Sequence, residues 1–398
     1  MVADTMASMP DLIPPPLPTP RQPPDSETRR WADAIRQAAT DQTPLWIQGG
    51  GSKAFLTGPT PSAGQTLDTR SHSGIVSYEP TELVVTVKAG TPLVELEEVL
   101  TEQGQQLAFE PPRYAAGTTV GGMVACGLSG PSRASVGGLR DFVLGAHLLN
   151  GKGEHLEFGG QVMKNVAGYD LSRLLAGSMG SLGVLTQVSL KVLPKAPGEA
   201  TLRFELSQAD SLDRLARWRG QPLPLNASCW VLDPDHASSG TLYLRLRGAV
   251  AAVEAACLSL TSQGSGERLD SHLTAPDWEA CRDQHLPFFL NPPDTSAALW
   301  RLSVAPNTPV LNGSWPTLVE WHGGLRWVWA PVDAASLLRS WAQASGGHAT
   351  LFRLPAQTTE AAERFTAPAG GLMAIHQRLK QAFDPAGIFN PGRWGFGI

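Results

Sequence analysis

Residues 117–122 read Gly117-Thr118-Thr119-Val120-Gly121-Gly122, and residues 177–183 read Gly177-Ser178-Met179-Gly180-Ser181-Leu182-Gly183. A third glycine-rich stretch, Gly49-Gly50-Gly51-Ser52-Lys53, directly follows a short apolar run at residues 45–47. Glycines at this density beside strand-like runs indicate a backbone that turns sharply or approaches another group closely. Tight turns alone explain one such cluster. Three clusters are better explained by a large flat ligand that carries a pyrophosphate.

The glycine stretch nearest the N-terminus has the character of a phosphate-binding loop. Backbone N–H groups exposed by a turn at residues 49–51 form a nest for phosphate oxygens, and the Ser52 hydroxyl adds a donor. Two familiar phosphate motifs are excluded by their spacing. Ser52 precedes Lys53, which reverses the Walker order, and no Gly-x-Gly-x-x-Gly opens a helix here. The loop therefore predicts phosphate binding in a different fold.

Composition limits the function classes that remain. The chain has 398 residues, of which 42% are hydrophobic and 17% charged, and its net charge is −5. This length predicts two domains, and the lack of a basic run gives no support to nucleic-acid binding. The apolar runs are too short to span a bilayer. No C-x-x-C pair occurs, so the sequence predicts no zinc ribbon or iron–sulfur cluster of its own and favours a reducing cytosol. The four cysteines are Cys126, Cys229, Cys257 and Cys281.

The glycine clusters and the motifs between them, taken in order, resemble the FAD-binding domain of the vanillyl-alcohol oxidase superfamily, the PCMH type. The resemblance covers roughly residues 42–195 and returns at the C-terminus. It implies an α+β protein, in which a PCMH-type FAD-binding domain of two α/β subdomains carries a cap domain with an antiparallel sheet and helices on one face. Besides the glycine stretches, the motifs are Leu67-Asp68, the strand at 83–90 that ends in Ala-Gly, Arg140 to Gly145 and Lys164 to Asp170.

We expect four parts along the chain: a disordered Pro-rich tail at 1–25, the FAD-binding domain at 26–197, a cap or substrate domain at 198–370, and a C-terminal segment at 371–398 that packs back on the FAD domain. The boundary at 197 follows from a run rich in Pro, Lys and Gly. A repeated β-α-β-β-α rhythm predicts the antiparallel sheet of the cap.

Two local signals give sharper expectations. Ser26 has the character of the N-cap of an amphipathic helix, because a short hydroxyl side chain satisfies free N–H groups of the first turn. Asn150-Gly151, flanked by apolar alternation, predicts a β-hairpin with a tight primed turn, since both residues tolerate positive φ.

The resemblance implies that all three glycine stretches bind FAD. The first loop would hold the pyrophosphate, residues 117–127 would pass along the isoalloxazine ring, and residues 177–185 would meet the adenine end. An Asn-Pro-Gly turn near the C-terminus would bring its Asn close to the ring. The implied FAD-binding residues are Gly49, Gly50, Gly51, Ser52, Lys53, Gly117, Thr118, Val120, Gly121, Gly122, Gly127, Gly180, Ser181, Gly183, Val184, Leu185 and Asn390.

We expect this FAD to be bound non-covalently. Superfamily members that attach FAD covalently often use a His in the first loop, where this chain carries Ser52 or Lys53. Cys126 would lie near the flavin in the same interpretation. A small buried thiol explains this cysteine better than a second point of attachment.

Flavin-dependent oxidation of an α-hydroxy acid needs a base for the hydroxyl proton and cations for the carboxylate. Arginine suits a carboxylate because its guanidinium binds bidentately. Each candidate taken singly is more often a solvated or structural residue. We expect no metal site, because the cap histidines stand alone without ligand spacing. The candidates are Arg301, Arg326, Arg353 and Arg378 for the carboxylate, and His322 and His376 for the base.

Over the whole chain, the compact cap, the missing metal histidines and the ending Asn390-Pro391-Gly392-Arg393-Trp394 resemble the FAD-binding subunits of glycolate oxidases. That resemblance implies a hetero-oligomer with a larger flavoprotein subunit and an iron–sulfur subunit. The complex would oxidise glycolate and related 2-hydroxy acids to 2-oxo acids, with electrons leaving through the iron–sulfur partner. It would lie in the cytoplasm, with peripheral membrane association through the complex. Two alternatives stay open: a stand-alone hydroxy-acid or sugar oxidase, and an assembly subunit whose flavin is structural.

Overall fold

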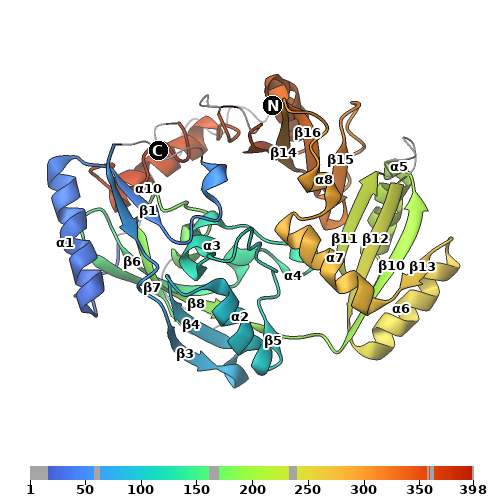
Figure 1. Cartoon of the computed structure of the whole chain (residues 1–398), viewed down its shortest axis with the longest axis horizontal. Helices are drawn as coiled ribbons and strands as arrows, with labels where there is room; N and C mark the ends of the chain where they lie inside the picture. Colours follow the sequence, from blue (N-terminus) through green and yellow to red (C-terminus); the bar gives the residue numbers. More distant parts are fainter. Residues whose placement is uncertain are drawn as a thin grey trace, which may run out of the picture.

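The computed structural model describes residues 17–57, 63–160, 170–232, 240–355, 358 and 363–396. Residues 1–16 of the expected Pro-rich tail, and the Lys164-to-Asp170 motif except for Asp170, lie outside these ranges. The described chain forms two lobes that lie side by side (Figure 1). The first lobe contains the N-terminal half and the C-terminal helix α10 (Gly370–Phe383), and the cap lobe contains the segment between them.

The first lobe is built on a five-stranded antiparallel sheet in the order β3-β4-β8-β6-β7. Because strand side chains alternate between faces, one face presents an apolar row that includes Val85, Val87 and Val188. Helices α2 and α3 bury their apolar residues in the same core. The elements are β3 Ile75–Glu79, β4 Val84–Lys88, β6 Val143–Leu149, β7 His155–Gly159, β8 Val184–Lys191, α2 Leu93–Glu102 and α3 Val120–Cys126.

A second layer of this lobe combines helix α1 (Ser26–Asp41) with two short parallel strands, β1 (Leu45–Gln48) and β2 (Gln65–Asp68). The buried face of α1 meets these strands and the chain that follows α10. This small core therefore joins the two ends of the described sequence. Its buried members are Trp31, Ala32, Ile35, Ala38, Leu45, Leu67, Leu149, Val184, Ile388 and Phe389.

The N-cap of α1 is Asp25, one residue before the expected Ser26. The Asp25 carboxylate accepts the backbone N–H of Thr28 at 2.8 Å, and the Thr28 hydroxyl in turn faces the Asp25 backbone N–H. This reciprocal capping box satisfies two N–H groups that the helix leaves free. A single hydroxyl at Ser26 offers only half of that arrangement, which explains the shift.

The expected hairpin is present, but its turn is not a two-residue primed turn. The β6–β7 pairing ends before residue 150 and resumes after 154, so a longer loop joins the strands. The Asn150 side chain shapes this loop, because its Oδ1 accepts the N–H groups of Lys152 and Glu154, both at 3.0 Å. Asn commonly bonds its own backbone in this way and competes with a tight turn.

Helix α10 and the turn after it dock on the same hairpin loop. The Gly151 N–H donates to the Phe383 carbonyl at 2.8 Å. The fully buried Asp384 carboxylate accepts the Phe389 N–H at 2.8 Å and pairs with Lys380 at 2.8 Å. A buried carboxylate needs such partners, so Asp384 fixes the path of the chain that follows α10.

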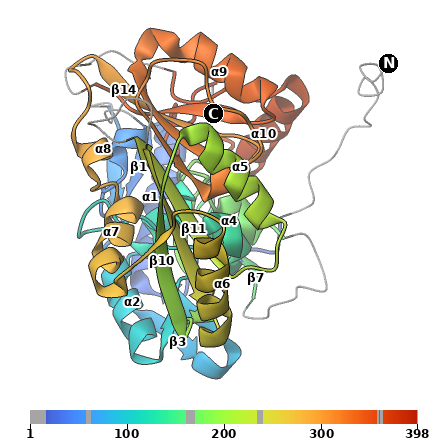
Figure 2. The ribbon, with the colours of Figure 1, turned by 90° about the vertical axis from the view of Figure 1, so that its right-hand side faces the viewer.

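The cap lobe is an eight-stranded sheet in the order β13-β10-β12-β11-β15-β16-β14-β17, in which every pairing is antiparallel. Helices α5, α6 and α9 cover one face, whereas α7 and α8 lie on the face turned toward the first lobe (Figures 1 and 2). The predicted α+β class and antiparallel cap sheet are thus confirmed, and α7 and α8 add a partial layer on the second face.

The bounds of the cap elements are β10 Gly198–Leu206, α5 Gln208–Arg219, β11 Leu225–Leu232, β12 Gly240–Gly248, α6 Val250–Ser262, β13 Glu267–Leu269, α7 Ser271–Asp283, α8 Pro287–Leu290, β14 Ala297–Ser303, β15 Thr317–Glu320, β16 Leu325–Pro331, α9 Ala335–Ala344 and β17 His348–Arg353. The first lobe also contains a short helix, α4 (Arg133–Val136), and a two-stranded ribbon of β5 (Gln105–Gln106) and β9 (Leu193–Pro194).

A buried ion cluster around Glu110 ties the cap to the first lobe. The Glu110 carboxylate accepts from the guanidiniums of Arg245 and Arg247 in β12, each at 2.7 Å. Arg245 is 1% exposed, donates to the Asn226 amide oxygen at 2.7 Å and lies 4.7 Å from the centre of the Trp278 ring. Burial alone would raise the pKa of Glu110, but the two guanidiniums outweigh it and lower that pKa to about 2.

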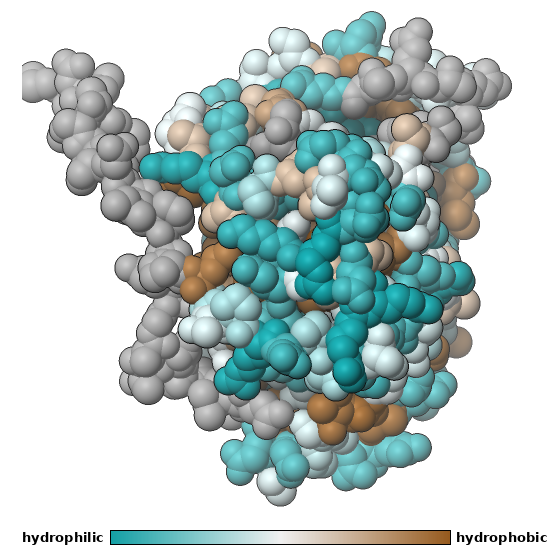
Figure 3. Space-filling model, turned by 90° about the vertical axis from the view of Figure 1, so that its left-hand side faces the viewer, coloured by the Kyte–Doolittle hydropathy of each residue, from teal (hydrophilic) through white to brown (hydrophobic). Residues whose placement is uncertain are grey.

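The surface of the first lobe that lies away from the cap is mostly hydrophilic, with apolar side chains in scattered small groups (Figure 3). Within the described ranges, no helix is both long enough and apolar enough to cross a bilayer.

Glu110→Gln removes the counter-charge of the buried Arg245. We expect this change to lower the free energy of unfolding by about 3–5 kcal/mol near neutral pH, as measured by urea denaturation. Glu254→Gln is the matched control, because the Glu254–Arg268 pair lies at the surface. Surface pairs contribute little to stability, so the control should leave the unfolding midpoint nearly unchanged.

The difference in stability between wild type and Glu110→Gln should depend on pH. The pKa of Glu110 is about 2 in the folded chain and 4.5 in its ordinary range, so the ionised carboxylate stabilises the folded state above about pH 4.5. This stabilisation is lost as the pH falls toward 2, and the difference between wild type and Glu110→Gln should shrink over that interval. A difference that stays constant there would contradict the role of the ion cluster.

Candidate functional site

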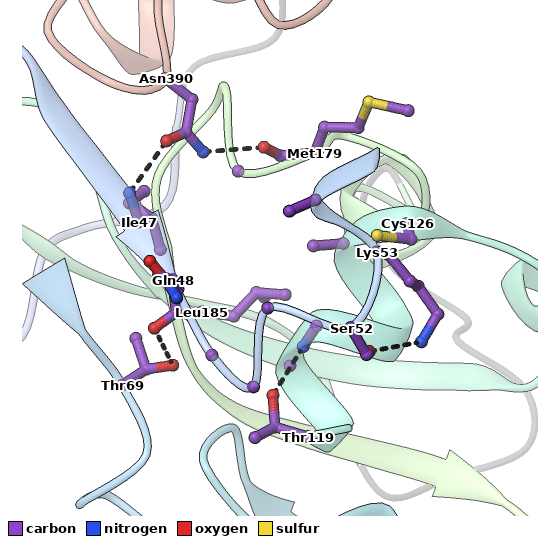
Figure 4. Close-up of a pocket in the computed structure, with 18 of the residues that line it drawn as sticks. Ile47, Gln48, Ser52, Lys53, Thr69, Thr119, Cys126, Met179, Leu185 and Asn390 are labelled. Carbon is purple, nitrogen blue, oxygen red and sulfur yellow. Dashed lines mark hydrogen bonds between the residues drawn. The ribbon is translucent and has the colours of Figure 1, made fainter. Parts of the chain in front are cut away.

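A cavity of about 320 Å³ lies where the three glycine stretches meet, a size typical of small-molecule sites. Its walls come from the loop after β1, from α3 and from residues 179–185, and the turn after α10 closes one side (Figure 4). The fold thus gathers into one site segments that lie far apart in the sequence.

The first loop runs against residues 117–119 with no room for side chains between them. A Cβ atom on Gly50 would overlap the carbonyl of Gly117, and one on Gly49 would overlap the Thr119 hydroxyl. Gly51 adopts φ = 69°, a left-handed conformation that favours glycine. These glycines are therefore required by backbone packing, and all three line the cavity, where their backbone is accessible to a ligand.

Residues 120–126 form helix α3, although their glycine density indicated a sharp turn or a close approach. Thr119 is its N-cap, and the Thr119 hydroxyl accepts the Gly122 N–H at 3.2 Å (Figure 4). A Cβ atom on Gly121 would lie 2.8 Å from the Cβ of Ala89, so this glycine allows α3 to pack beside the end of β4. Gly121 and Gly122 both line the cavity.

Asn390 joins two walls of the cavity. Its side-chain oxygen accepts the Ile47 N–H at 2.9 Å, and its amide nitrogen donates to the Met179 carbonyl at 2.8 Å (Figure 4). The backbone of Asn390 has φ = 43°, which Asn tolerates better than most residues. Gly180 is packed so closely that a Cβ atom there would lie 2.5 Å from the Asn390 amide nitrogen. Asn390 therefore aligns the first and third glycine stretches.

Most of the residues that the sequence predicts to bind FAD line this cavity. Thr118, which is not among the lining residues, donates to the Ser52 hydroxyl at 2.8 Å. The lining residues are Gly49, Gly50, Gly51, Ser52, Lys53, Gly121, Gly122, Gly180, Gly183, Leu185 and Asn390. Those outside the lining are Gly117, Thr118, Val120, Gly127, Ser181 and Val184.

The lining also includes residues that the expected list lacks, among them Gln48, Thr69, Thr119, Met179 and Arg393. Thr69 follows the Leu-Asp motif, and its hydroxyl donates to the Gln48 carbonyl at 3.3 Å (Figure 4). Arg393 belongs to the C-terminal Asn-Pro-Gly-Arg sequence. Both positions adjoin a recognised motif, which is the signal that would have identified them.

Lys53 places a cation in the cavity wall. It is 7% exposed, its ammonium lies 3.4 Å from the Ser52 hydroxyl, and it forms no ion pair with any described residue. Burial lowers the pKa of Lys53. Cys126 lines the same wall, and burial raises the pKa of its thiol. A thiol with a raised pKa is a poor nucleophile at neutral pH.

Beside Lys53, the cavity adjoins an aromatic cluster that the two lobes share. The Lys53 ammonium lies 5.6 Å from the centre of the Tyr114 ring, which packs edge-on against Phe55 at 5.6 Å and Phe352 at 6.4 Å. The Arg353 guanidinium lies 4.3 Å from the Phe55 ring and 5.5 Å from the Tyr114 ring. The β14–β17 register shifts by one residue here, and such a bulge lets the neighbours Phe352 and Arg353 both face the first lobe.

Two of the expected carboxylate ligands, Arg301 and Arg353, come together at this interface. Arg301 lies in β14, with its guanidinium 5.0 Å from the centre of the Trp321 ring. Burial, with Arg133 nearby, lowers the pKa of Arg301 to about 10, so this residue remains cationic at neutral pH. Arg353 donates to the Gln284 side-chain oxygen at 2.8 Å. Within the described chain, neither arginine forms an ion pair.

The other candidates lie elsewhere. His322 is buried with its ring nitrogens 3.1 Å from the hydroxyls of Ser135 and Ser228, and burial lowers its pKa to about 4. Arg326 is buried and donates to two backbone carbonyls, as a structural residue does. Among the described residues, no group of His, Cys, Asp and Glu is arranged to hold a metal ion. His376 and Arg378 lie on α10, outside the cavity lining.

Comparison with known proteins agrees with this geometry. The sequence profile described as "FAD binding domain" matches residues 26–159. The glycolate oxidase subunit GlcE of Escherichia coli strain K12 is 46% identical over 368 residues, which cover 91% of this chain and 95% of that protein. The glycolate oxidase subunit GlcD of Bacillus subtilis strain 168 is 29% identical over 44% of this chain and 37% of its own length. A D-lactate dehydrogenase of Archaeoglobus fulgidus is 30% identical over 41% of this chain and 36% of its own length.

Among solved structures, an alkyldihydroxyacetonephosphate synthase aligns with a TM-score of 0.62 over 90% of this chain and 73% of its own, at 16% identity, which is evidence for a shared fold alone. The match to GlcE extends over both lobes, and the FAD-domain match covers residues 26–159 of the first lobe, which include the first and second glycine stretches. The resemblance to PCMH-type flavoproteins is thereby confirmed, and the chain belongs to the glycolate oxidase subunit GlcE family of FAD-binding oxidoreductases.

Proposed function

We propose that this chain is the FAD-bearing subunit of a complex that oxidises glycolate and related 2-hydroxy acids to 2-oxo acids. The observation that carries the proposal is that the glycine-lined cavity lies close to two half-buried arginines of the cap, neither of which forms an ion pair with a described residue. A flavin in the cavity would meet a substrate whose carboxylate is held by Arg301 and Arg353. The relatives named glycolate oxidase and D-lactate dehydrogenase act, by their names, on 2-hydroxy acids, which supports this substrate class.

The residues present fit FAD in chemical character. Open backbone N–H groups at Gly49–Gly51 and the Ser52 hydroxyl suit a pyrophosphate, and Lys53 supplies positive charge. Bound FAD supplies hydride acceptance. The chain itself would align the cofactor through the glycine-lined walls. Arg301 and Arg353 would bind the carboxylate and so fix the orientation of the substrate.

We further propose that electrons leave through a partner. The names of the relatives, subunit GlcE and subunit GlcD, indicate multi-subunit enzymes. All four cysteines of the chain are free thiols, and they lie in separate elements with no cluster motif, so an iron–sulfur centre would belong to another subunit. The expected assembly contains a larger flavoprotein subunit and an iron–sulfur subunit, in the cytoplasm and in peripheral contact with the membrane.

The cofactor should be dissociable. The first loop offers Ser52 and Lys53 where covalent relatives carry a His, and the Cys126 thiol has a raised pKa. We expect acid precipitation of the purified yellow protein to release all of its flavin into the supernatant as FAD. Flavin absorbance that stays with the precipitate would contradict non-covalent binding.

Gly50→Ala should weaken FAD binding. The added methyl group overlaps the Gly117 carbonyl, so the first loop and the second glycine stretch must separate. We expect FAD affinity to fall at least about 10-fold, as measured by flavin fluorescence titration of the apoprotein, since this displacement opens the wall of the site. Gly371→Ala is the control, because a Cβ atom there meets no atom within 4 Å. Equal affinities of the two variants would exclude the cavity as the FAD site.

The central experiment is anaerobic addition of glycolate and D-lactate to the FAD-loaded chain, alone and together with candidate partner subunits. We expect the oxidised flavin band to bleach once the complex is assembled. Bleaching of the isolated chain would instead favour a stand-alone oxidase. Flavin that binds yet stays oxidised in the complex would favour a structural role in assembly.

A further inference from the structure

Tyr114 stands at the centre of the aromatic cluster between the cavity and the cap. Its backbone has φ = 56°, an uncommon conformation for a bulky residue that is most often kept where function requires it. Phe55 and Phe352 fix the ring on two sides. The hydroxyl, by contrast, has no hydrogen-bond partner anywhere in the described chain. A half-buried tyrosine usually finds such a partner, so this hydroxyl is free to bind a ligand.

Two cations lie against this ring, and a third lies one ring further away. Lys53 approaches from the first loop and Arg353 from β17. Arg301 in β14 lies 6.0 Å from the centre of the Trp327 ring, which packs against Phe352 at 4.8 Å. In the described ranges, none of the three has an ion pair. Like charges that gather without counter-ions repel one another, and the low dielectric of the interface strengthens that repulsion. An anion bound between them would remove this cost.

The nearest acidic residues do not supply that anion. Asp283 is taken by Arg282 at 2.7 Å and by the backbone N–H of Arg113 at 2.8 Å. Glu320 accepts from the Trp327 indole at 2.7 Å and from the Cys281 thiol at 2.9 Å. Burial raises the pKa of Glu320, so this carboxyl group keeps its proton to a higher pH than an exposed one. The positive charge around Tyr114 therefore remains available to a ligand.

We propose that Tyr114, Lys53, Arg301 and Arg353 form one carboxylate-binding site across the two lobes, in which the Tyr114 hydroxyl donates a hydrogen bond to the bound carboxylate. The inference rests on the proposed function, because the carboxylate is that of a small 2-hydroxy acid or its 2-oxo product. Tyr114 thereby becomes a substrate-binding residue that the two arginines alone do not replace, since its rigid ring fixes the position of the donor.

The same cations have a second conceivable ligand, the pyrophosphate of FAD, which is also an oxyanion. The two ligands can be distinguished by which affinity a variant lowers. A variant of a carboxylate site lowers the affinity for a small acid, whereas a variant of a pyrophosphate site lowers the affinity for FAD. Each variant is therefore titrated with both ligands.

The test is calorimetric titration of oxalate, a carboxylate that flavin cannot oxidise by hydride removal, into the FAD-loaded chain. Wild type should bind oxalate. Tyr114→Phe keeps the ring and its packing, and should weaken oxalate binding about 10-fold, the effect of one hydrogen bond to a charged group. Arg301→Met should weaken it at least about 30-fold. Tyr78→Phe is the control, because the Tyr78 hydroxyl is bound to Gln105 at 2.9 Å in the first lobe.

Three results would overturn the inference: no oxalate binding by wild type, equal oxalate affinity of Tyr114→Phe and Tyr78→Phe, or a loss of FAD affinity without a loss of oxalate affinity. The proposed function fails separately. If the chain binds oxalate through these residues but glycolate does not reduce its flavin in any assembly, the carboxylate site stands and the proposed reaction is wrong.

Discussion

The contact between the backbones at Gly50 and Gly117 is the constraint on which the site depends. Two main chains can touch at this distance only where no Cβ atom intervenes, and the first loop provides this at Gly49 and Gly50 together. The contact brings β1 against the N-cap of α3, and Asn390 then holds β1 against the third glycine stretch. The absence of side chains at Gly49 and Gly50 thus allows the walls to pack and leaves the backbone of the loop at the cavity surface.

A second constraint acts between the lobes. Arg245 is a fully desolvated cation in the cap sheet, and such a charge is tolerated only with close counter-charge. Glu110 supplies it from the first lobe, so the cap cannot move away without exposing or isolating a buried charge. The ion cluster therefore helps to hold β17 against residues 54–56 of the first lobe. Arg353 reaches the Tyr114 ring because that position is fixed.

The sequence predicts a feature well where that feature depends on neighbouring residues. The glycine loops, the antiparallel cap and the placement of Asn390 beside the glycine stretches follow from local patterns or from an ordered set of motifs. The sequence analysis missed features that arise from distant partners. Tyr114 has no local signature, since its value comes from Lys53 and Arg353, which lie in other segments. The bulge that turns Arg353 toward the first lobe depends on pairing with β14, and the sequence of residues 348–353 alone does not predict it. Histidine is a residue type that often serves as a catalytic base, yet His322 is buried and its ring nitrogens contact two serine hydroxyls.

The division of the site between lobes has an energetic consequence. Lys53 and Tyr114 belong to the first lobe, and Arg301 and Arg353 belong to the cap, so an anion held by all four bridges the interface. A ligand that binds only the closed arrangement stabilises that arrangement by mass action. Without such an anion the cations near Tyr114 would oppose the docking of the cap, whereas the Glu110 cluster favours it at the same interface. A bound anion would turn the cation group into a second attractive contact between the lobes.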